Sequence, residues 1–182
     1  MDAAIRVLGT RGPRQLTHRA VDAEAGLPAG STSNYLRTRA ALIGAVVTRL
    51  GELDRADWYR LAGAPAPRQV PELARLLAQV VAQATGPDRH RTLARYALFV
   101  EAAVNPAVRE QLASGRAEIL GWASQWLRAL GLPEPERDTA MVLDYLDGLI
   151  LHRLALPEPD LDPAPAIAQL LSAVANPGRP DG

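Results

Sequence analysis

The 182-residue sequence contains no cysteine and no lysine, and it is poor in aromatic residues, with one Phe, three Trp and four Tyr. The absence of cysteine excludes a disulfide framework and a thiolate metal site. No apolar run reaches the length of a membrane span, and residues 1–15 lack the apolar stretch of a signal peptide. We therefore expect a cytoplasmic protein without a membrane partner. With so few aromatics, the core must consist of Leu, Ala and Val, which favours helices.

The formal net charge is zero, but charge is distributed unevenly along the chain. Residues 1–50 contain seven arginines and three acidic residues, whereas residues 51–182 contain 13 arginines and 17 acidic residues. A positive N-terminal part followed by a negative remainder is typical of a protein that contacts phosphate with one end only.

Helical periodicity covers most of the chain, and no segment shows the period of two that a strand requires. Glycine and proline clusters separate the helical segments, and Gly9 and Gly12 are expected to limit the first of them. The pattern predicts an all-α protein with about nine helices, at residues 2–11, 17–25, 28–36, 38–61, 69–85, 88–104, 106–130, 136–154 and 164–175.

The clearest local signal lies in residues 16–42. Thr17 is a good N-cap for a helix of small residues, Gly26 suits the end of that helix, and Pro28 suits the first turn of the next. The following run from Ser31 to Tyr35 is rich in hydrogen-bonding groups and poor for burial. Two short helices joined by a turn that contains glycine, the second helix small and polar, indicate a helix-turn-helix that reads DNA.

On these residues, the segment resembles the N-terminal domain of the tetracycline-repressor-like (TetR) transcriptional regulators. The matching features are Thr17, the turn Ala25-Gly26-Leu27, Gly30, Tyr35, the pair Thr38-Arg39, and Leu42. Two positions depart from the family pattern, because Leu36 replaces the usual aromatic residue and Arg39 replaces the usual lysine. Leu36 is still able to fill a small core, and Arg39 keeps the positive charge.

The resemblance implies a three-helix DNA-binding domain at residues 1–45 and a larger helical domain at residues 46–182 that binds an effector and dimerises. It implies a homodimer formed through residues 136–154 and 164–175, and a repressor released from a palindromic double-stranded DNA operator by a small molecule. The basic arm that usually precedes the first helix is very short or absent here. No nucleophile elbow, phosphate loop or zinc-protease motif occurs, so we expect neither an enzyme nor a cofactor.

The residues expected to contact DNA lie in and around the second helix of the motif. The candidates for contacts to base edges are Ser31, Thr32 and Asn34, and the small residues that would let the helix approach a groove are Ala29 and Gly30. The candidates for phosphate contacts are Thr17, Tyr35, Thr38 and Arg39, while Arg37 could serve either purpose. The reading helix contains no Arg or Gln, so we expect small contacts and DNA shape to provide specificity.

Most large side chains of the C-terminal part lie on helices that surround an effector cavity in the resembled family. Taken singly, each is also explained as simple core, but we expect several to line such a cavity, with a charged residue supplying polar contacts. The candidates are Arg95, Tyr96, Phe99, Glu101, Trp122, Trp126, Met141 and Tyr145. Asp144, Asp147 and His152 are only a weak metal signal, so no metal site is predicted.

Two alternatives remain open from the sequence. The chain could be a helical protein that binds small molecules, or a protein-interaction module, in either case with a helix-turn-helix that has no DNA target.

Overall fold

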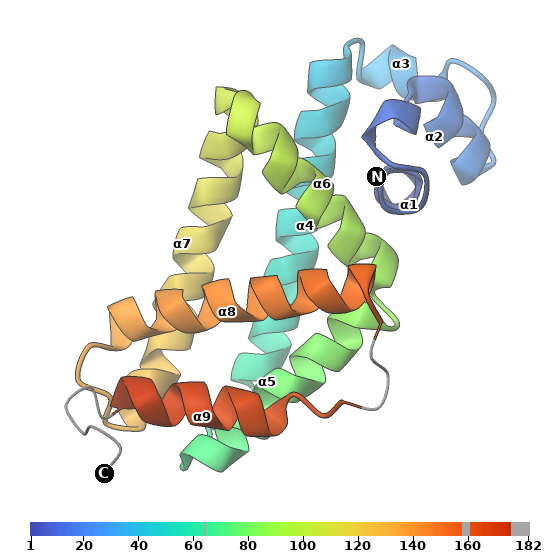
Figure 1. Ribbon diagram of the computed structural model, residues 1–182. Coiled ribbons are helices and arrows are strands. Elements are labelled where there is room, and N and C mark those ends of the chain that lie inside the picture. The colour runs from blue at the N-terminus through green and yellow to red at the C-terminus, as the bar shows by residue number, and fades with distance from the viewer. Residues whose placement is uncertain (64, 158–160, 176–182) are drawn as a thin grey trace. The chain divides into compact units, whose positions relative to one another are not determined.

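The computed structural model describes residues 1–63, 65–157 and 161–175 (Figure 1). These residues form nine α-helices and one short 3-10 helix, with no strand in the described ranges. The helices are α1 (Asp2–Arg11), η1 (Pro13–Gln15), α2 (His18–Ala25), α3 (Ser31–Tyr35), α4 (Arg39–Ala62), α5 (Val70–Thr85), α6 (Arg89–Val104), α7 (Pro106–Ala129), α8 (Pro135–Ala155) and α9 (Ala164–Ala175). The predicted all-α class and helix number are confirmed, and only the start of α3 differs by more than one residue.

The helices form two compact units. The first consists of residues 1–59 and 88–116, and the second of the described parts of residues 60–87 and 117–182. Helices α4 and α7 each contribute to both units. The predicted domain boundary after residue 45 separates the expected DNA-binding helices from the rest of the chain. Because this boundary is defined by function, it stays a prediction.

The core of the first unit is built mainly from small and medium-sized aliphatic side chains of α1, α4 and α6. Helix α1 packs against both α2 and α6. Apolar positions three or four residues apart place one stripe of each helix in the core, as expected for amphipathic helices. The buried residues include Ala4, Ile5 and Leu8 of α1, Leu42, Val46 and Leu50 of α4, and Ala94, Leu98 and Ala102 of α6.

Gly9 lies inside α1 and does not end it, so its predicted role as a boundary is wrong. A Cβ atom at Gly9 would lie only 1.8 Å from the backbone carbonyl oxygen of His90, in the first turn of α6. The missing side chain therefore lets the backbones of α1 and α6 approach closely. Helix α1 ends at Arg11. The next residue, Gly12, has a φ of 82°, and its amide donates to the carbonyl of Leu8.

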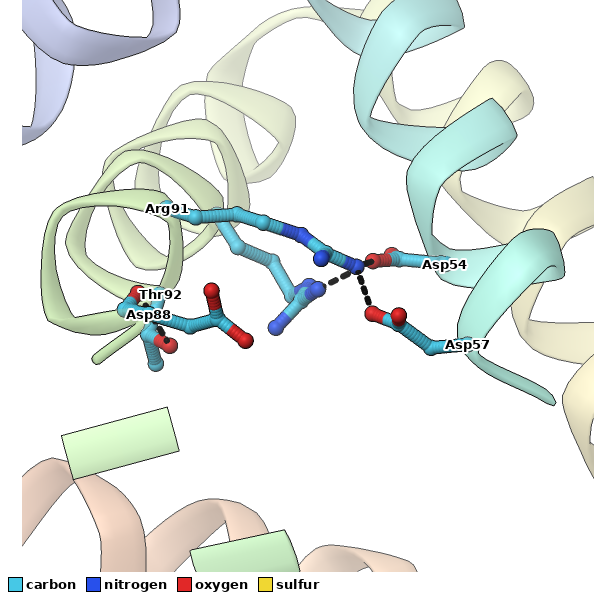
Figure 2. A network of polar contacts seen from close by, with 6 residues as sticks. Asp54, Asp57, Asp88, Arg91 and Thr92 are labelled. Atoms are coloured by element: carbon cyan, nitrogen blue, oxygen red, sulfur yellow. Dashed lines mark hydrogen bonds and ion pairs between the residues drawn. The ribbon is translucent and has the colours of Figure 1, made fainter. Parts of the chain in front are cut away.

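A network of charged side chains joins α4 to α6 within the same unit (Figure 2). Arg91 Nη2 donates to Asp54 Oδ1 at 2.6 Å and also pairs with the carboxylate of Asp57, while Arg95 donates to the same oxygen of Asp54. Burial alone would lower the pKa of Arg91, but the two carboxylates outweigh burial and raise it. The network thus joins two arginines of α6 to the carboxylates of α4 at a partly buried helix contact.

The second unit has its own aliphatic core. Helix α5 contacts α8 and α9, and α8 contacts α9. The buried side chains include Leu73, Leu77 and Val81 of α5, Leu127 of α7, Val142, Leu146, Ile150 and Leu154 of α8, and Ile167, Leu171 and Val174 of α9.

Candidate DNA-binding site

Helix α2 begins and ends at the residues that the sequence predicts. The hydroxyl oxygen of Thr17 accepts a hydrogen bond from the amide of Ala20 at 3.1 Å, which caps the first turn. At the other end, Gly26 has the left-handed conformation, with a φ of 67°, and the amide of Leu27 donates to the carbonyl of Asp22 at 2.9 Å. Both predicted caps are therefore confirmed.

Helix α3 begins at Ser31, three residues later than predicted. Gly30 has a φ of 95° and serves as the N-cap, a left-handed conformation that excludes it from the helix. The amide of Ser31 donates to the carbonyl of Pro28 at 3.2 Å, which closes a tight turn over residues 28–31. Pro28 therefore lies in the turn and not in the helix.

A buried aspartate on α2 holds the start of α3. Asp22 is 1% exposed, and its carboxylate accepts hydrogen bonds from the amide of Gly30 (2.8 Å), the amide of Thr32 (2.8 Å) and the hydroxyl of Thr32 (2.5 Å). The Thr32 hydroxyl, followed by the two amides and the nearby charge of His18, lowers the pKa of Asp22 against the opposing effect of burial. Because the N-cap Gly30 has no side chain, Asp22 supplies the missing cap from the preceding helix.

This arrangement corrects the prediction for Thr32. Its side chain is buried, with 8% exposure, and its hydroxyl donates to Asp22, so it is not available to contact a base. The sequence predicted Thr32 as a reader because it lies in a polar run, but its side chain fixes α3 to α2.

The exposed part of α3 consists mainly of Asn34 and Tyr35. Tyr35 is 89% exposed, and the side chain of Asn34 is exposed without an internal hydrogen bond among the described residues. Ser31 is half-buried, and its hydroxyl donates to the carbonyl of Pro28 at 2.6 Å. Ala29 before the helix is exposed and leaves the approach to α3 open.

The two residues that open α4 have different surroundings. The hydroxyl oxygen of Thr38 accepts from the amide of Ala41 at 3.0 Å and caps the first turn of α4. Arg39 donates to the carbonyl of Leu16 at 2.6 Å and to the carbonyl of Pro13 at 2.7 Å. The guanidinium predicted to clamp a phosphate thus ties α4 to the segment between α1 and α2.

Internal ion pairs neutralise part of the positive charge in the first 50 residues. Glu24 pairs with Arg6 at 3.0 Å and with Arg11 at 2.8 Å, and Arg49 pairs with Asp2 at 2.7 Å. Within residues 1–50, all of which the structure describes, three exposed arginines have neither an ion pair nor a side-chain hydrogen bond, namely Arg14, Arg19 and Arg37. Of these, Arg14 in η1 was missed as a candidate, because the sequence does not show which charges are paired.

The candidate effector residues of the first unit lie on α6. Tyr96 and Phe99 form an edge-to-face pair with ring centroids 5.8 Å apart, and Phe99 is partly exposed. Arg95 donates to Asp54, and Glu101 accepts from the side-chain amide of Asn105 at 3.2 Å. The guanidinium of Arg95, expected to face an effector, instead joins α6 to α4.

The other four candidates lie in the second unit. Trp122 and Trp126 on α7 and Tyr145 on α8 are partly buried, while Met141 on α8 is 47% exposed. Their role in effector binding stays a prediction.

Comparisons with known proteins identify the family. A family profile described as "Tetracyclin repressor-like, C-terminal domain" matches residues 68–177. The chain belongs to the TetR family. Multidrug binding protein EbrR, solved with ethidium, is 30% identical, with 95% of this chain and 94% of that chain covered and a TM-score of 0.69. SCO1917, a TetR-family member from Streptomyces coelicolor A3, is 30% identical with the same coverage and a TM-score of 0.71.

A transcriptional regulator from Rhodococcus sp. Rha1 shares the fold, with a TM-score of 0.72 at 23% identity, over 96% of this chain and 91% of that chain. No curated protein matches the sequence. The resemblance noted in residues 16–42 is thus confirmed, and the TetR-family chain is a DNA-binding transcriptional regulator.

Two further expectations concern metal sites and membrane spans. Among the described residues, no group of three or more metal-ligating side chains comes together, and His152 Nδ1 lies 2.9 Å from the carbonyl oxygen of Gly148. No helix in the described ranges is both long and apolar enough to cross a membrane.

Proposed function

We propose that this TetR-family protein is a homodimeric repressor that leaves a palindromic operator when a small molecule binds. The observation that carries the proposal is the surface of the helix-turn-helix. Asn34 and Tyr35 are exposed on α3, and Arg37, two residues after the end of the helix, is exposed without an ion pair among the described residues. A short polar helix beside unpaired arginines suits a major groove lined by phosphates.

The proposed contacts divide into base readers and phosphate contacts. Asn34 and Ser31 face base edges, and Ala29 and Gly30 allow α3 to approach the groove. The phosphate contacts are Thr17, Tyr35, Arg37, Thr38, Arg14 and Arg19. Thr32 and Arg39 act indirectly, by holding α3 and the start of α4 in place.

The proposed dimer forms through α8 and α9. Leu151 of α8 is 47% exposed and Leu156, directly after the helix, is 69% exposed, and neighbouring exposed apolar side chains support an interface there. Two DNA-binding heads related by a two-fold axis require half-sites separated by one helical turn, about 34–36 Å, or a multiple of it.

The proposed effector is an organic molecule with an aromatic ring. EbrR has been solved with ethidium, with imidazole and with proflavin. In this chain the candidate contacts of the second unit are Trp122, Trp126, Met141 and Tyr145. The effector releases DNA to the extent that it binds the DNA-incompetent conformation more tightly than the competent one.

The decisive experiment selects DNA from a genomic fragment library with the full chain at several salt concentrations. We expect a palindromic site whose affinity falls steeply with salt. The Tyr35→Ala variant should weaken binding to all sequences, whereas Thr48→Ala, which changes an exposed residue in α4, should not. If no fragment is retained at low salt, the chain is not a DNA-binding repressor, and a sensor without a DNA target becomes the better description.

Effector binding is measured on the protein alone, because ethidium intercalates into DNA. We expect ethidium to quench the tryptophan fluorescence and to raise the melting temperature. Absence of both effects would exclude aromatic molecules of the ethidium type as the effector. Sedimentation at micromolar concentration tests the dimer, and a monomer would contradict the proposed interface.

A further inference from the structure

The serine and threonine hydroxyl groups of α3 donate their protons to acceptors within the protein. A serine or threonine hydroxyl has one proton to donate and two lone pairs that accept. Ser31 Oγ lies 2.6 Å from the carbonyl oxygen of Pro28, and Ser33 Oγ lies 3.0 Å from the carbonyl oxygen of Gly30. Since a carbonyl oxygen only accepts, both hydroxyls must be the donors. The hydroxyl of Thr32 donates to the carboxylate of Asp22 in the same way.

Ser31 is held in this state by its own backbone. Both its amide and its hydroxyl donate to the same carbonyl oxygen of Pro28, at 3.2 and 2.6 Å. Turning the hydroxyl toward another acceptor would break the shorter of these two bonds, at the turn that starts α3. An intramolecular hydrogen bond of this kind contributes roughly 3- to 10-fold to an equilibrium.

Of these three residues, Ser31 lies at the exposed N-terminus of α3. Thr32 is buried, and Ser33 bonds to Gly30, whose carbonyl also accepts from the amide of Asn34 at 3.1 Å. Ser31 is half-buried and follows the exposed Ala29 and the N-cap Gly30. The first turn of a recognition helix is the part that reaches base edges.

From this geometry we propose that Ser31 reads DNA as a hydrogen-bond acceptor and therefore selects a base that presents an amino group in the major groove. Only adenine, through N6, and cytosine, through N4, present such a donor there. Guanine O6 and N7 and thymine O4 are acceptors, and they would face an oxygen lone pair. The inference rests on the proposed DNA-binding function and adds the chemistry of the base that Ser31 recognises.

Asn34 differs from Ser31 in this respect. Its amide group carries both donors and an acceptor, and no internal hydrogen bond within the described residues commits either. Asn34 is able to form the bidentate contact to adenine N6 and N7, whereas Ser31 distinguishes amino from carbonyl edges. The two residues therefore make separable contributions to the operator sequence.

The test selects operators from a random duplex library with the full chain and with Ser31→Ala. One operator position should show a base preference with the unaltered protein and none with Ser31→Ala. That position contains the base that Ser31 contacts. Every base pair carries one amino group in the major groove, on its adenine or on its cytosine, so the base pair at that position identifies the amino group to be removed. Thr48→Ala, an exposed hydroxyl on α4, serves as the matched control and should leave every preference unchanged.

A second measurement uses the unaltered protein and removes only the amino group. Adenine at the marked position is replaced by purine, or cytosine by 2-pyrimidinone, and affinity is measured by fluorescence anisotropy. We expect a loss of about 3- to 10-fold for the protein and no further loss for Ser31→Ala. An analogue that the protein binds with undiminished affinity overturns the inference.

The outcomes separate this inference from the function on which it rests. Specific binding that depends on Asn34 and Tyr35, with no position sensitive to Ser31, removes the inference and leaves the proposed function intact. Failure to retain any duplex at low salt removes the proposed function itself.

Discussion

Gly9 is the position at which one added methyl group tests the packing of α1 against α6. A Cβ atom there would lie 1.8 Å from the carbonyl oxygen of His90, whereas ordinary contacts lie at 3.4–4 Å. The obstacle is backbone, so Gly9→Ala forces the two helices apart locally by roughly 1.5 Å. Overpacking of this kind costs about 1–3 kcal/mol, and the better helix propensity of alanine offsets only about 0.5–1 kcal/mol.

We therefore expect Gly9→Ala to lower the free energy of unfolding by about 1 kcal/mol and the melting temperature by about 2–4 °C. The control is Gly44→Ala in α4, where the nearest atom to an added Cβ is Gln111 Nε2 at 3.9 Å. That substitution should be neutral or stabilising by about 0.5–1 kcal/mol. Both are followed by far-UV circular dichroism. Equal melting temperatures for the two variants would refute the close contact between α1 and α6.

Three further changes test the polar contacts. The pKa of Asp22 is lowered in the folded state, so its carboxylate stabilises the protein at neutral pH, and this stabilisation is lost as the pH falls through the folded pKa. Asp22→Asn should therefore show a smaller loss of stability on acidification in pH-dependent denaturation. Arg37→Ala should reduce the slope of log affinity against log salt by about 0.9 in anisotropy titrations, and an unchanged slope would exclude a phosphate contact. Asp54→Ala leaves Arg95 and Arg91 without a shared acceptor and should cost about 1–3 kcal/mol in urea denaturation, with Asp54→Asn costing less; equal losses would show that charge is unimportant there.

The helices were predictable because their signals are local. Thr17 and Thr38 cap α2 and α4 through amides three residues away, and Gly26 ends α2 through its own conformation. Each such signal lies within one turn of the residue that it affects, so the sequence displays it directly. The nine-helix fold follows from these signals together with the apolar periodicity.

The clasp between Asp22 and Thr32 was not predictable for the opposite reason. An aspartate on a short helix is usually exposed, and nothing beside it in the sequence indicates burial. Its partners lie eight and ten residues away, across a turn whose geometry depends on the left-handed conformation of Gly30. The same limit applies to Arg39, whose carbonyl partners belong to a segment more than twenty residues earlier. A polar residue therefore looks equally free in the sequence whether it faces DNA or the protein.

The first two turns of α6 concentrate the contacts that hold the helices beneath the DNA-binding surface. The carbonyl of His90 meets Gly9 of α1, while Arg91 and Arg95 bind Asp54 of α4. Close packing against a backbone carbonyl leaves no room for small adjustments. When the carboxylate of Asp54 moves, its hydrogen bonds to both arginines break together. A displacement of these turns must therefore either carry α1 and α4 along or break both contacts at once.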